Sequence, residues 1–456
     1  MSGFAENIEL PVAYLKIISL LNVRSFKGKN EIFLSDKDRK PAQWTVILGN
    51  NNTGKTTILK CIADLYLRTE KASTTPFNMD NLIDEKSERT KEEAYVLTPN
   101  KLPLNLITHS EGEYSLGIYT LGEFEPVFIN KKTNQHLITR AFCRVGLGSF
   151  NGEYGFFFDI GYPHMKHIFL QGYSTQRKTS ESSLSEQENT ETVQSFFSNN
   201  FELINVEEWL LQVNYASKND DSPKSDRERA KRIEKRVREV ITSEILPDIQ
   251  DFRFRSTQDF KNYIEFQTDY GWIRLKDLGY GYQATLAWVM DLAKRMFDRY
   301  PTSKNPLAEP AVVLVDEIDL HLHPEWQRKI ISYLSNIFKN TQFIVTAHSP
   351  LIIQSAENVN LVMLEKDGDH INIRQQFGSF KGWTVDEILD ELMGMNDKTM
   401  SDTYLELMKD FDNALDEDNY EKAHSAYEGL DKILHPSSPQ RKILRIQMSS
   451  LAPIEA

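Results

Sequence analysis

The stretch "GNNNTGKT", residues 49–56, decides the fold class of this chain of 456 residues. It satisfies the phosphate-loop pattern GxxxxGK[ST]. The run before it, "QWTVIL", is apolar and rich in β-branched residues, and the run after it, "TILKCIADLYL", places apolar residues at helical spacing. A strand, a glycine-bearing loop and a helix in this order predict a phosphate-binding loop in an α/β fold.

Each part of this loop has an expected role. Backbone N–H groups and the N-terminus of the following helix hold the phosphates, Lys55 reaches the β and γ phosphates, and the Thr56 hydroxyl ligates Mg²⁺. The sequence therefore predicts ATP and Mg²⁺ as ligands, with Lys55 acting in catalysis. The predicted nucleotide-contacting residues of the loop are Gly49, Asn50, Asn51, Asn52, Thr53, Gly54, Lys55, Thr56 and Thr57.

A second stretch, "VDEIDLHLHPEWQ" at 315–327, supplies the carboxylates that such a loop needs. Asp316 ends a buried apolar run and is predicted to hold Mg²⁺, and Glu317 is placed to polarise the attacking water. An independent metal site on His321 and His323 stays open as an alternative. Their spacing in a loop, without CxxC or HExxH company, does not favour it.

His348 in "VTAHSP" also ends an apolar run. A lone histidine is usually a structural residue. The loop, the carboxylate pair and the strand-end histidine together resemble the ABC-type ATPase heads, in the branch that contains DNA-repair ATPases and the overcoming-lysogenization-defect nucleases. This resemblance spans nearly the whole chain, and it implies that His348 is the switch histidine at the γ-phosphate.

The resemblance also implies a fold and further contacts. The fold would be an α/β ABC-type P-loop head with a mixed sheet, an antiparallel β insertion, a helical signature lobe and a C-terminal helical tail. Arg24 in "LLNVRSF" matches an arginine near the nucleotide. Gln171 in "FLQGYSTQR" matches the Q-loop glutamine, which contacts both nucleotide and Mg²⁺, with Gln176 as the alternative.

The signature motif departs from the family pattern. "LGYGYQ" at 278–283 stands where the family has LSGGQ, so that Gly279 occupies the serine position. In the family this segment contacts the nucleotide held by the other subunit, which makes Gly279 and Gly281 candidate contacts. Loss of the hydroxyl removes a hydrogen bond made across the dimer, so slow turnover or a nucleotide-held clamp is expected. His323 takes the place of a D-loop aspartate, with a role either at the dimer interface or in packing.

Pattern changes along the chain divide it into five segments. The predicted segments are an N-terminal half of the ATPase head with the antiparallel β region at 1–178, a mobile Ser/Thr/Glu-rich loop at 179–200, a helical signature lobe at 201–300, a C-terminal half of the head at 301–379 and a helical tail at 380–456. In the tail, the apolar stripe of Tyr404, Leu407, Met408 and Phe411 is expected either to dock a partner or to pack on the head.

The composition indicates in which cellular compartment the protein is expected. The net charge is -13, and the two cysteines form neither a disulfide framework nor a zinc pattern. No secretion signal is recognised and no apolar run approaches the roughly 20 residues that span a bilayer. A cytoplasmic protein with no membrane contact is expected.

The basic helix Lys224–Arg238 is either a solvated surface or a track for the DNA backbone.

The function expected from these features is an ATPase that dimerises around ATP and regulates a nucleic-acid process. The short helical tail leaves little room for a nuclease domain in this chain. The head with this tail is similar to the ATPase subunit of Septu-type anti-phage systems, which implies a homodimer or higher oligomer and a separate HNH nuclease as partner. The alternatives are the nucleotide-binding subunit of a membrane transporter and an ATP-dependent scaffold without significant hydrolysis.

Overall fold

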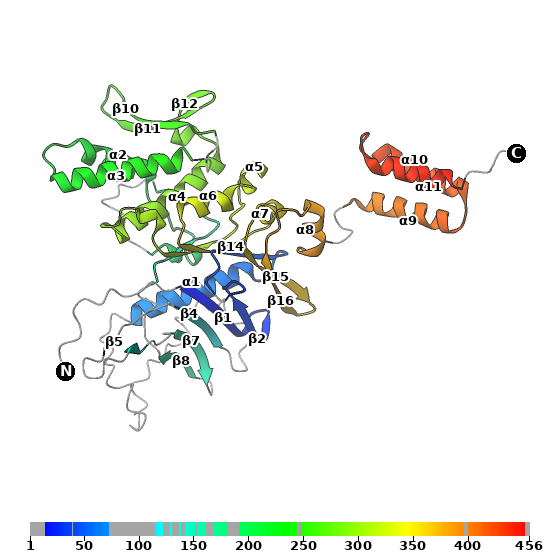
Figure 1. Ribbon diagram of the computed structural model, residues 1–456, viewed down its shortest axis with the longest axis horizontal. Helices are drawn as coiled ribbons and strands as arrows, with labels where there is room; N and C mark the ends of the chain where they lie inside the picture. The colour runs from blue at the N-terminus through cyan, green and yellow to red at the C-terminus, as the bar shows by residue number, and fades with distance from the viewer. Residues whose placement is uncertain are drawn as a thin grey trace. The chain divides into compact units, whose positions relative to one another are not determined.

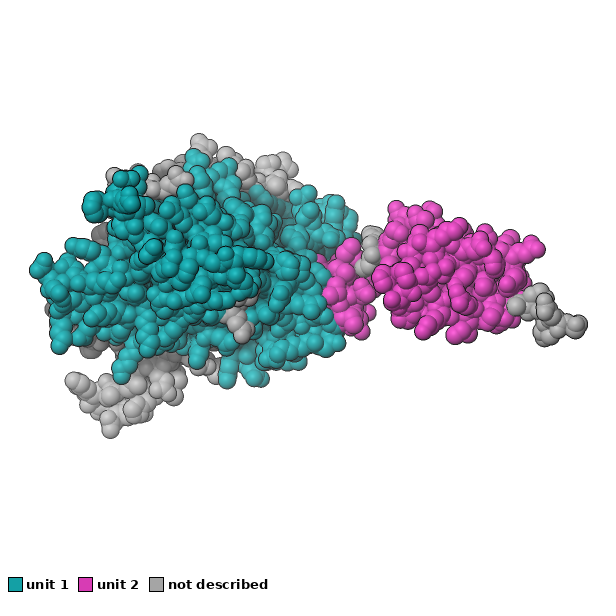
Figure 2. Space-filling view, turned by 90° about the horizontal axis from the view of Figure 1, so that it is seen from above, with its two compact units in different colours: residues 1–383 teal, residues 384–456 magenta. Residues whose placement is uncertain are grey.

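The computed structural model describes residues 14–38, 40–72, 115–121, 128–129, 136–137, 142–150, 153–160, 168–180, 191–243, 246, 248–395 and 400–451. The chain divides into two compact units, residues 1–383 and residues 384–456 (Figure 2). Each unit is described by itself. Among the described residues, no helix combines the length and the apolar character needed to cross a membrane.

A six-stranded mixed sheet forms the centre of the first unit, in the order β16-β15-β3-β14-β13-β9. Its strands are β3 (Trp44–Gly49), β9 (Leu170–Tyr173), β13 (Ala311–Val315), β14 (Thr341–Thr346), β15 (Val359–Asp367) and β16 (His370–Gly378). All neighbours pair in parallel except β15 with β16. The strands β3, β13 and β14 are buried along nearly their whole length, which is why they read as continuous apolar runs. Their carboxyl ends meet at one edge of the sheet.

A second, five-stranded antiparallel sheet confirms the expected β insertion. Its order is β2-β1-β4-β7-β8, with β1 at Tyr14–Val23, β2 at Phe26–Phe33, β4 at Ser115–Leu121, β7 at Phe142–Phe150 and β8 at Glu153–Ile160. A short pair, β5 (Phe128–Ile129) and β6 (His136–Leu137), stands apart from it. Helix α1 (Lys55–Ala72) runs between the two sheets, and Ile58 and Ile62 are fully buried in the core that both sheets share (Figure 1).

The expected signature lobe contains helices α2 (Val206–Lys218), α3 (Lys224–Ile241) and α4 (Tyr280–Arg299). A three-stranded antiparallel sheet accompanies them, formed by β10 (Asp251–Ser256), β11 (Asn262–Thr268) and β12 (Gly271–Arg274). Helix α4 covers the face of the central sheet opposite α1 (Figure 1), and its Trp288 ring lies 5.6 Å from that of Tyr173 on β9. The short helices are η6 (Leu275–Asp277) and η7 (Pro306–Ala308).

Short helices follow the carboxyl ends of β13 and β14. They are α5 (Pro324–Gln327), α6 (Ile330–Ile337) and α7 (Pro350–Gln354). On α6, Ser335 accepts a hydrogen bond of 2.8 Å from the indole nitrogen of Trp44, which ties this helix to β3.

The segment expected to be a mobile loop, 179–200, is described only at its two ends. Thr179 forms a bridge with Leu203, and residues Thr192–Phe196 form the 3-10 helix η5. Phe196 and Val193 of this helix are buried against β9, where a Cβ added to Gly172 would meet the Phe196 ring at 2.8 Å. The ends of the segment are therefore packed parts of the head, and 181–190 lies outside the described residues.

The second unit is helical, as expected. It contains α8 (Val385–Glu391), α9 (Asp402–Asp416), α10 (Tyr420–Ile433) and α11 (Pro439–Ser449), and a capping box of Thr384 and Glu387 begins α8. The stripe on α9 packs against α10 and α11, with Phe411 fully buried. The stripe therefore faces the core of this unit itself, because three short amphipathic helices can bury each other's apolar faces.

Candidate functional site

The loop between β3 and α1 has the backbone that a phosphate cradle requires. Gly49 has φ +152° and Gly54 has φ +94°, values that side chains rarely adopt. Space is restricted as well, since a Cβ on Gly49 would lie 2.6 Å from the Thr53 hydroxyl and one on Gly54 would lie 2.8 Å from the Phe26 ring. The exposed residues Asn50, Asn51 and Asn52 form the outer rim of the loop.

Lys55 folds across the mouth of the loop. Its Nζ donates hydrogen bonds of 2.6 Å to the carbonyl oxygen of Gly49 and 2.9 Å to that of Asn50. Burial lowers the pKa of this amine, while the carboxylates of Asp316 and Glu317 oppose the shift. The ammonium thus lies inside the cradle, at the place where phosphate charge would be neutralised.

Asp316, which follows β13, links the phosphate loop to the end of β14 through side-chain hydrogen bonds. The Thr56 hydroxyl donates to its two carboxylate oxygens at 3.1 and 2.9 Å, and the Thr346 hydroxyl donates to Oδ1 at 2.6 Å. The Asp316 side chain is 3% exposed. The donor set of a hydroxyl and a buried carboxylate consists of hard oxygens, and it fits Mg²⁺. Thr56 and Asp316 are therefore the residues that would hold the ion.

Glu317 and His348 face each other beside this pair. Glu317 has φ +48°, an uncommon value for a residue with a side chain, and its backbone nitrogen donates to the Thr346 hydroxyl at 2.7 Å. Its Oε1 lies 4.0 Å from Nε2 of His348, and both side chains are about one-third exposed. The backbone nitrogen of His348 donates to Asp319 Oδ2 at 3.0 Å. The strained turn directs the carboxylate toward solvent next to the phosphate cradle, where a water could be polarised.

Arg177 is a residue of this site that the sequence patterns did not single out. Its guanidinium is 5% exposed and donates to the backbone oxygens of Asp316 at 2.6 Å and Glu317 at 2.8 Å. Burial lowers its pKa to about 10, which leaves it charged at neutral pH. Its carbon Cζ lies 5.9 Å from the centre of the Trp288 ring. Arg177 thus binds the backbone of the Asp316–Glu317 turn on its buried side, and it connects this turn to β9 and α4.

The two candidate glutamines lie in different environments. Gln171 is inside β9, opposite Val313 of β13, and is 2% exposed. Its side-chain oxygen accepts a hydrogen bond of 2.8 Å from Thr192. Within the described residues this is the hydrogen bond of the Gln171 side chain, and none joins it to Asp316 or to the phosphate loop, so its contact with nucleotide and Mg²⁺ stays a prediction. Gln176 lies beyond the end of β9, is exposed and adjoins Arg177, so it is the better placed of the two.

Arg24 lies in the turn between β1 and β2, with φ +51°. It donates a hydrogen bond of 2.9 Å to the hydroxyl of Thr57, in the first turn of α1. The structure thus brings the predicted Arg24 next to the phosphate loop. In this position its side chain contacts Thr57, at the start of α1 directly after the phosphate loop.

The signature segment forms the start of α4. Gly279 is the N-cap residue, with φ -56° and ψ 147°, and a Cβ added there would meet only the Tyr282 ring at 3.6 Å. Gly281 differs, because its Cβ would lie 2.3 Å from the carbonyl oxygen of His321. The absence of a side chain is therefore required at Gly281 and is not required by the fold at Gly279.

The two histidines of the "HLH" segment have structural contacts. The His321 ring packs edge-on against the Tyr280 ring at 4.8 Å, and His321 has φ +63°. The ring nitrogen Nδ1 of His323 accepts a hydrogen bond of 3.4 Å from the backbone of Glu325, at the N-cap of α5. Within the described ranges, no three His, Cys, Asp or Glu side chains gather as a metal-binding group.

The sheet order, the loop after β3 and the carboxylates after β13 define the fold of an ABC-type P-loop ATPase head. The family model described as "AAA domain, putative AbiEii toxin, Type IV TA system" matches residues 168–354, from just before β9 to the end of α7. Nucleotide binding and ATP hydrolysis are the chemistry of this class.

Two relatives show which proteins of this class the chain resembles in sequence. The chain is similar to Septu protein PtuA of Bacillus thuringiensis, with 38% identity over 204 residues that cover 43% of this chain and 51% of the relative. It is also similar to Septu protein PtuA of Bacillus mycoides (strain KBAB4), with 27% identity over 394 residues that cover 85% of this chain and 46% of the relative. The chain spans about half the length of these curated relatives. The resemblance to Septu-type ATPases is confirmed.

Among solved structures, the SMC head bound to the C-winged helix domain of ScpA matches over 80% of this chain and 98% of that chain. The sequence identity is 15% and the TM-score is 0.43.

Proposed function

We propose that this chain hydrolyses ATP at the edge of the central sheet and that the nucleotide state of a head-to-head dimer controls a partner nuclease of the HNH type in anti-phage defence. The observation that carries the ATPase part is the hydrogen bonding of Thr56 to Asp316, which joins the phosphate loop to the carboxylate strand. Similarity to Septu protein PtuA supports the defence role.

Each residue of the site has a proposed task. Lys55 and the loop amides bind the phosphates, and Mg²⁺ held by Thr56 and Asp316 would supply Lewis-acid stabilisation of phosphate charge. Glu317 accepts a hydrogen bond from the attacking water, and His348 contacts the γ-phosphate. Arg177 keeps the Asp316–Glu317 turn in position. Gln176 is the proposed Q-loop residue.

Dimerisation is proposed because Glu317 and His348, beside the phosphate loop, keep about one-third of their side chains exposed within one chain. The signature segment with Gly279 at the start of α4 would cover the nucleotide of a second copy, with backbone N–H groups and the helix N-terminus facing the phosphate. No hydroxyl is present at Gly279. This favours slow hydrolysis, and it leaves a nucleotide-held scaffold as a second candidate function.

The experiment for this function combines two measurements on one preparation. The purified chain is assayed for Mg²⁺-dependent ATP hydrolysis, and the proteins that co-purify with it from its native operon are identified. Hydrolysis with a co-purifying nuclease supports the proposal. ATP binding without hydrolysis favours the scaffold, and a co-purifying membrane permease contradicts both.

A further inference from the structure

The basic helix α3 does not present a uniform row of cations. Four of its arginines form ion pairs with neighbouring carboxylates, namely Arg227 with Asp220, Arg229 with Asp298, Arg236 with Glu239 and Arg238 with Asp251. By contrast, no side-chain hydrogen bond or ion pair joins Lys224, Lys231, Arg232 or Lys235 to another residue of the described chain. The charge left without a counterion is therefore concentrated on part of the helix.

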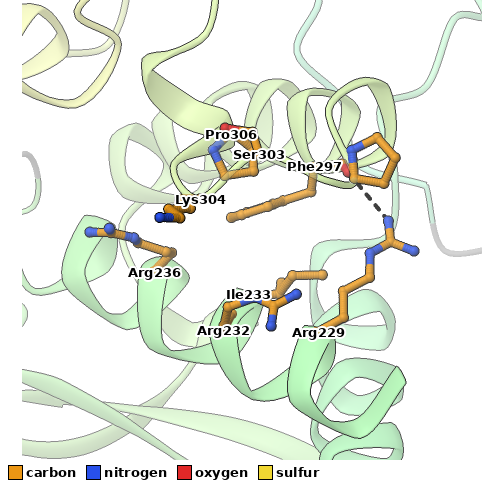
Figure 3. A pocket seen from close by; sticks show the side chains of 9 residues that line it. Arg229, Arg232, Ile233, Arg236, Phe297, Ser303, Lys304 and Pro306 are labelled. Carbon is orange, nitrogen blue, oxygen red and sulfur yellow. Dashed lines mark hydrogen bonds between the residues drawn. The ribbon is translucent and has the colours of Figure 1, made fainter. Parts of the chain in front are cut away.

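A hollow lies beside this part of α3, between the helix and the segment that follows α4 (Figure 3). Arg229, Arg232 and Arg236 line it from one face of α3, where residues three, four and seven positions apart share a side. Lys304 lines it from the opposite wall, and the buried ring of Phe297 forms its apolar floor. The hollow is shallow and open to solvent, with a cavity volume of about 20 Å³.

The electrostatics of the hollow favour an anion. Four cationic side chains line it and no lining residue carries a carboxylate. Arg229 and Arg236 pair with Asp298 and Glu239 outside the hollow, so the uncompensated charge within it is that of Arg232 and Lys304. Arg229 is oriented by a hydrogen bond of 3.3 Å to the Phe297 carbonyl oxygen, drawn as a dashed line in Figure 3. Among the described residues, Arg232 and Lys304 have no partner. Like charges in one hollow repel, so an oxyanion that contacts several of them is stabilised there.

We propose that this hollow binds a phosphate group of a nucleic-acid backbone. Guanidinium groups match phosphate oxygens through paired N–H donors, and an ammonium on the far wall adds a point charge. The inference deepens the proposed control of a nucleic-acid process and rests on it for the identity of the ligand. It places the contact at the hollow and not along the whole of Lys224–Arg238.

A polymer is favoured over a small phosphate compound by the surroundings of the hollow. The hollow is small for a ligand site and has no enclosed compartment for a base. Lys231 and Lys235, which have no partner within the described chain, extend the positive charge along the same helix beside Arg232. A chain of phosphates can contact both the hollow and these lysines, whereas a free phosphate can occupy the hollow only.

The test compares two double variants of the full chain by fluorescence anisotropy with labelled single-stranded and double-stranded oligonucleotides. Arg232→Ala with Lys304→Ala removes the two unpaired cations of the hollow. Arg227→Ala with Lys422→Ala removes the same charge from paired residues outside it. We expect at least a tenfold loss of affinity for the first variant, with the salt-dependence slope lower by about 1. The control variant should stay within twofold of the parent.

ATP binding is measured on the same samples and should be unchanged in both variants, which separates this site from the ATP site. If the parent binds oligonucleotides and the hollow variant binds them equally well, the hollow is not the contact although a nucleic-acid function survives. If the parent binds pyrophosphate but no oligonucleotide, and the hollow variant loses pyrophosphate, the site takes a small phosphate compound and the proposed polymer is wrong.

Discussion

The hydroxyl of Thr56 donates a hydrogen bond of 2.9 Å to Oδ2 of Asp316, although 260 positions separate the two residues in the chain. The contact exists because β3 and β13 lie on either side of β14, so that the loop after one strand meets the carboxylate after the other. The order of the strands in the central sheet therefore brings the parts of the candidate ATP site together.

Replacement of Gly279 by serine should raise ATP turnover. The backbone at Gly279 has the extended conformation that N-cap serines adopt, and the added Cβ meets only ordinary contact with Tyr282. A hydroxyl donor to a charged phosphate across the dimer contributes about 1.5–3 kcal/mol. If it acts in the transition state, the rate should increase roughly tenfold to a hundredfold. Steady-state hydrolysis rates of the two proteins measure this.

The matched control is Gly281→Ala in the same helix. Its Cβ would collide with the His321 carbonyl oxygen, so the segment after Asp316 must shift. We expect a loss of about 1–3 kcal/mol in the free energy of unfolding, together with lower turnover. Equal rates for Gly279→Ser and the parent would mean that the missing hydroxyl does not limit hydrolysis.

Arg177 should act as a positioning residue for the strained turn. Arg177→Met removes the side-chain donor to the Asp316 carbonyl oxygen, at a cost of about 1–3 kcal/mol, and leaves the Glu317 carbonyl oxygen with the backbone N–H of Leu320 as its donor. We expect kcat to fall more than tenfold while KM for ATP changes less than threefold, because the phosphate loop itself is intact. Arg177→Lys should restore part of kcat. A variant in which kcat and KM both stay at parental values would remove Arg177 from the site.

How far the sequence predicts this site depends on the kind of residue. The loop, Asp316 and His348 follow from patterns, because each stands at the end of an apolar strand and parallel strands end at one edge. Arg177 has no such pattern, since its role comes from burial under a turn that is distant in sequence. The same holds for Gly281, whose requirement is set by the His321 carbonyl.

Two expectations differ from the structure for physical reasons. Gln171 was expected in a loop, but β9 continues to Tyr173, so its side chain is buried within the head. The stripe with Phe411 was expected to meet the head or a partner, and instead it forms the core of its own unit. Apolar periodicity identifies a buried face but does not say which surface buries it.

The helical unit should be dispensable for ATP binding. Its core is formed by its own helices α9, α10 and α11, and the phosphate loop and the carboxylate strand both lie in the other unit. Deletion of residues 384–456 should leave the affinity for Mg²⁺-ATP within about twofold of the parent and should release a nuclease partner, as judged by co-purification. Loss of the folded head, seen as loss of cooperative thermal unfolding, would contradict this.

A finer variant of the same test uses the exposed apolar residues of α11. Ile443 is 55% exposed and Ile446 is 69% exposed. Replacing both with serine should preserve the fold of the unit and weaken capture of the partner. Lys442→Ser in the same helix is the control and should have no effect on capture.

Glu317→Gln should preserve ATP binding and stop hydrolysis. The amide keeps the shape of the side chain but cannot accept a proton from water, while Asp316 and Thr56 remain to hold Mg²⁺. We expect at least a hundredfold loss of turnover and a longer-lived nucleotide-bound dimer, measured by phosphate release and by size-exclusion chromatography with ATP. Parental turnover in this variant would assign the catalytic carboxylate elsewhere.

The most direct test of the central claim is a calorimetric titration of Mg²⁺-ATP into the parent protein and into Lys55→Ala. Lys55 donates hydrogen bonds to the carbonyl oxygens of Gly49 and Asn50, which places its ammonium inside the loop that would bind the phosphates. We expect saturable binding by the parent and an affinity at least a hundredfold weaker in the variant, with its thermal unfolding unchanged. Equal affinities in the two proteins would contradict the assignment of the ATP site to residues 49–56.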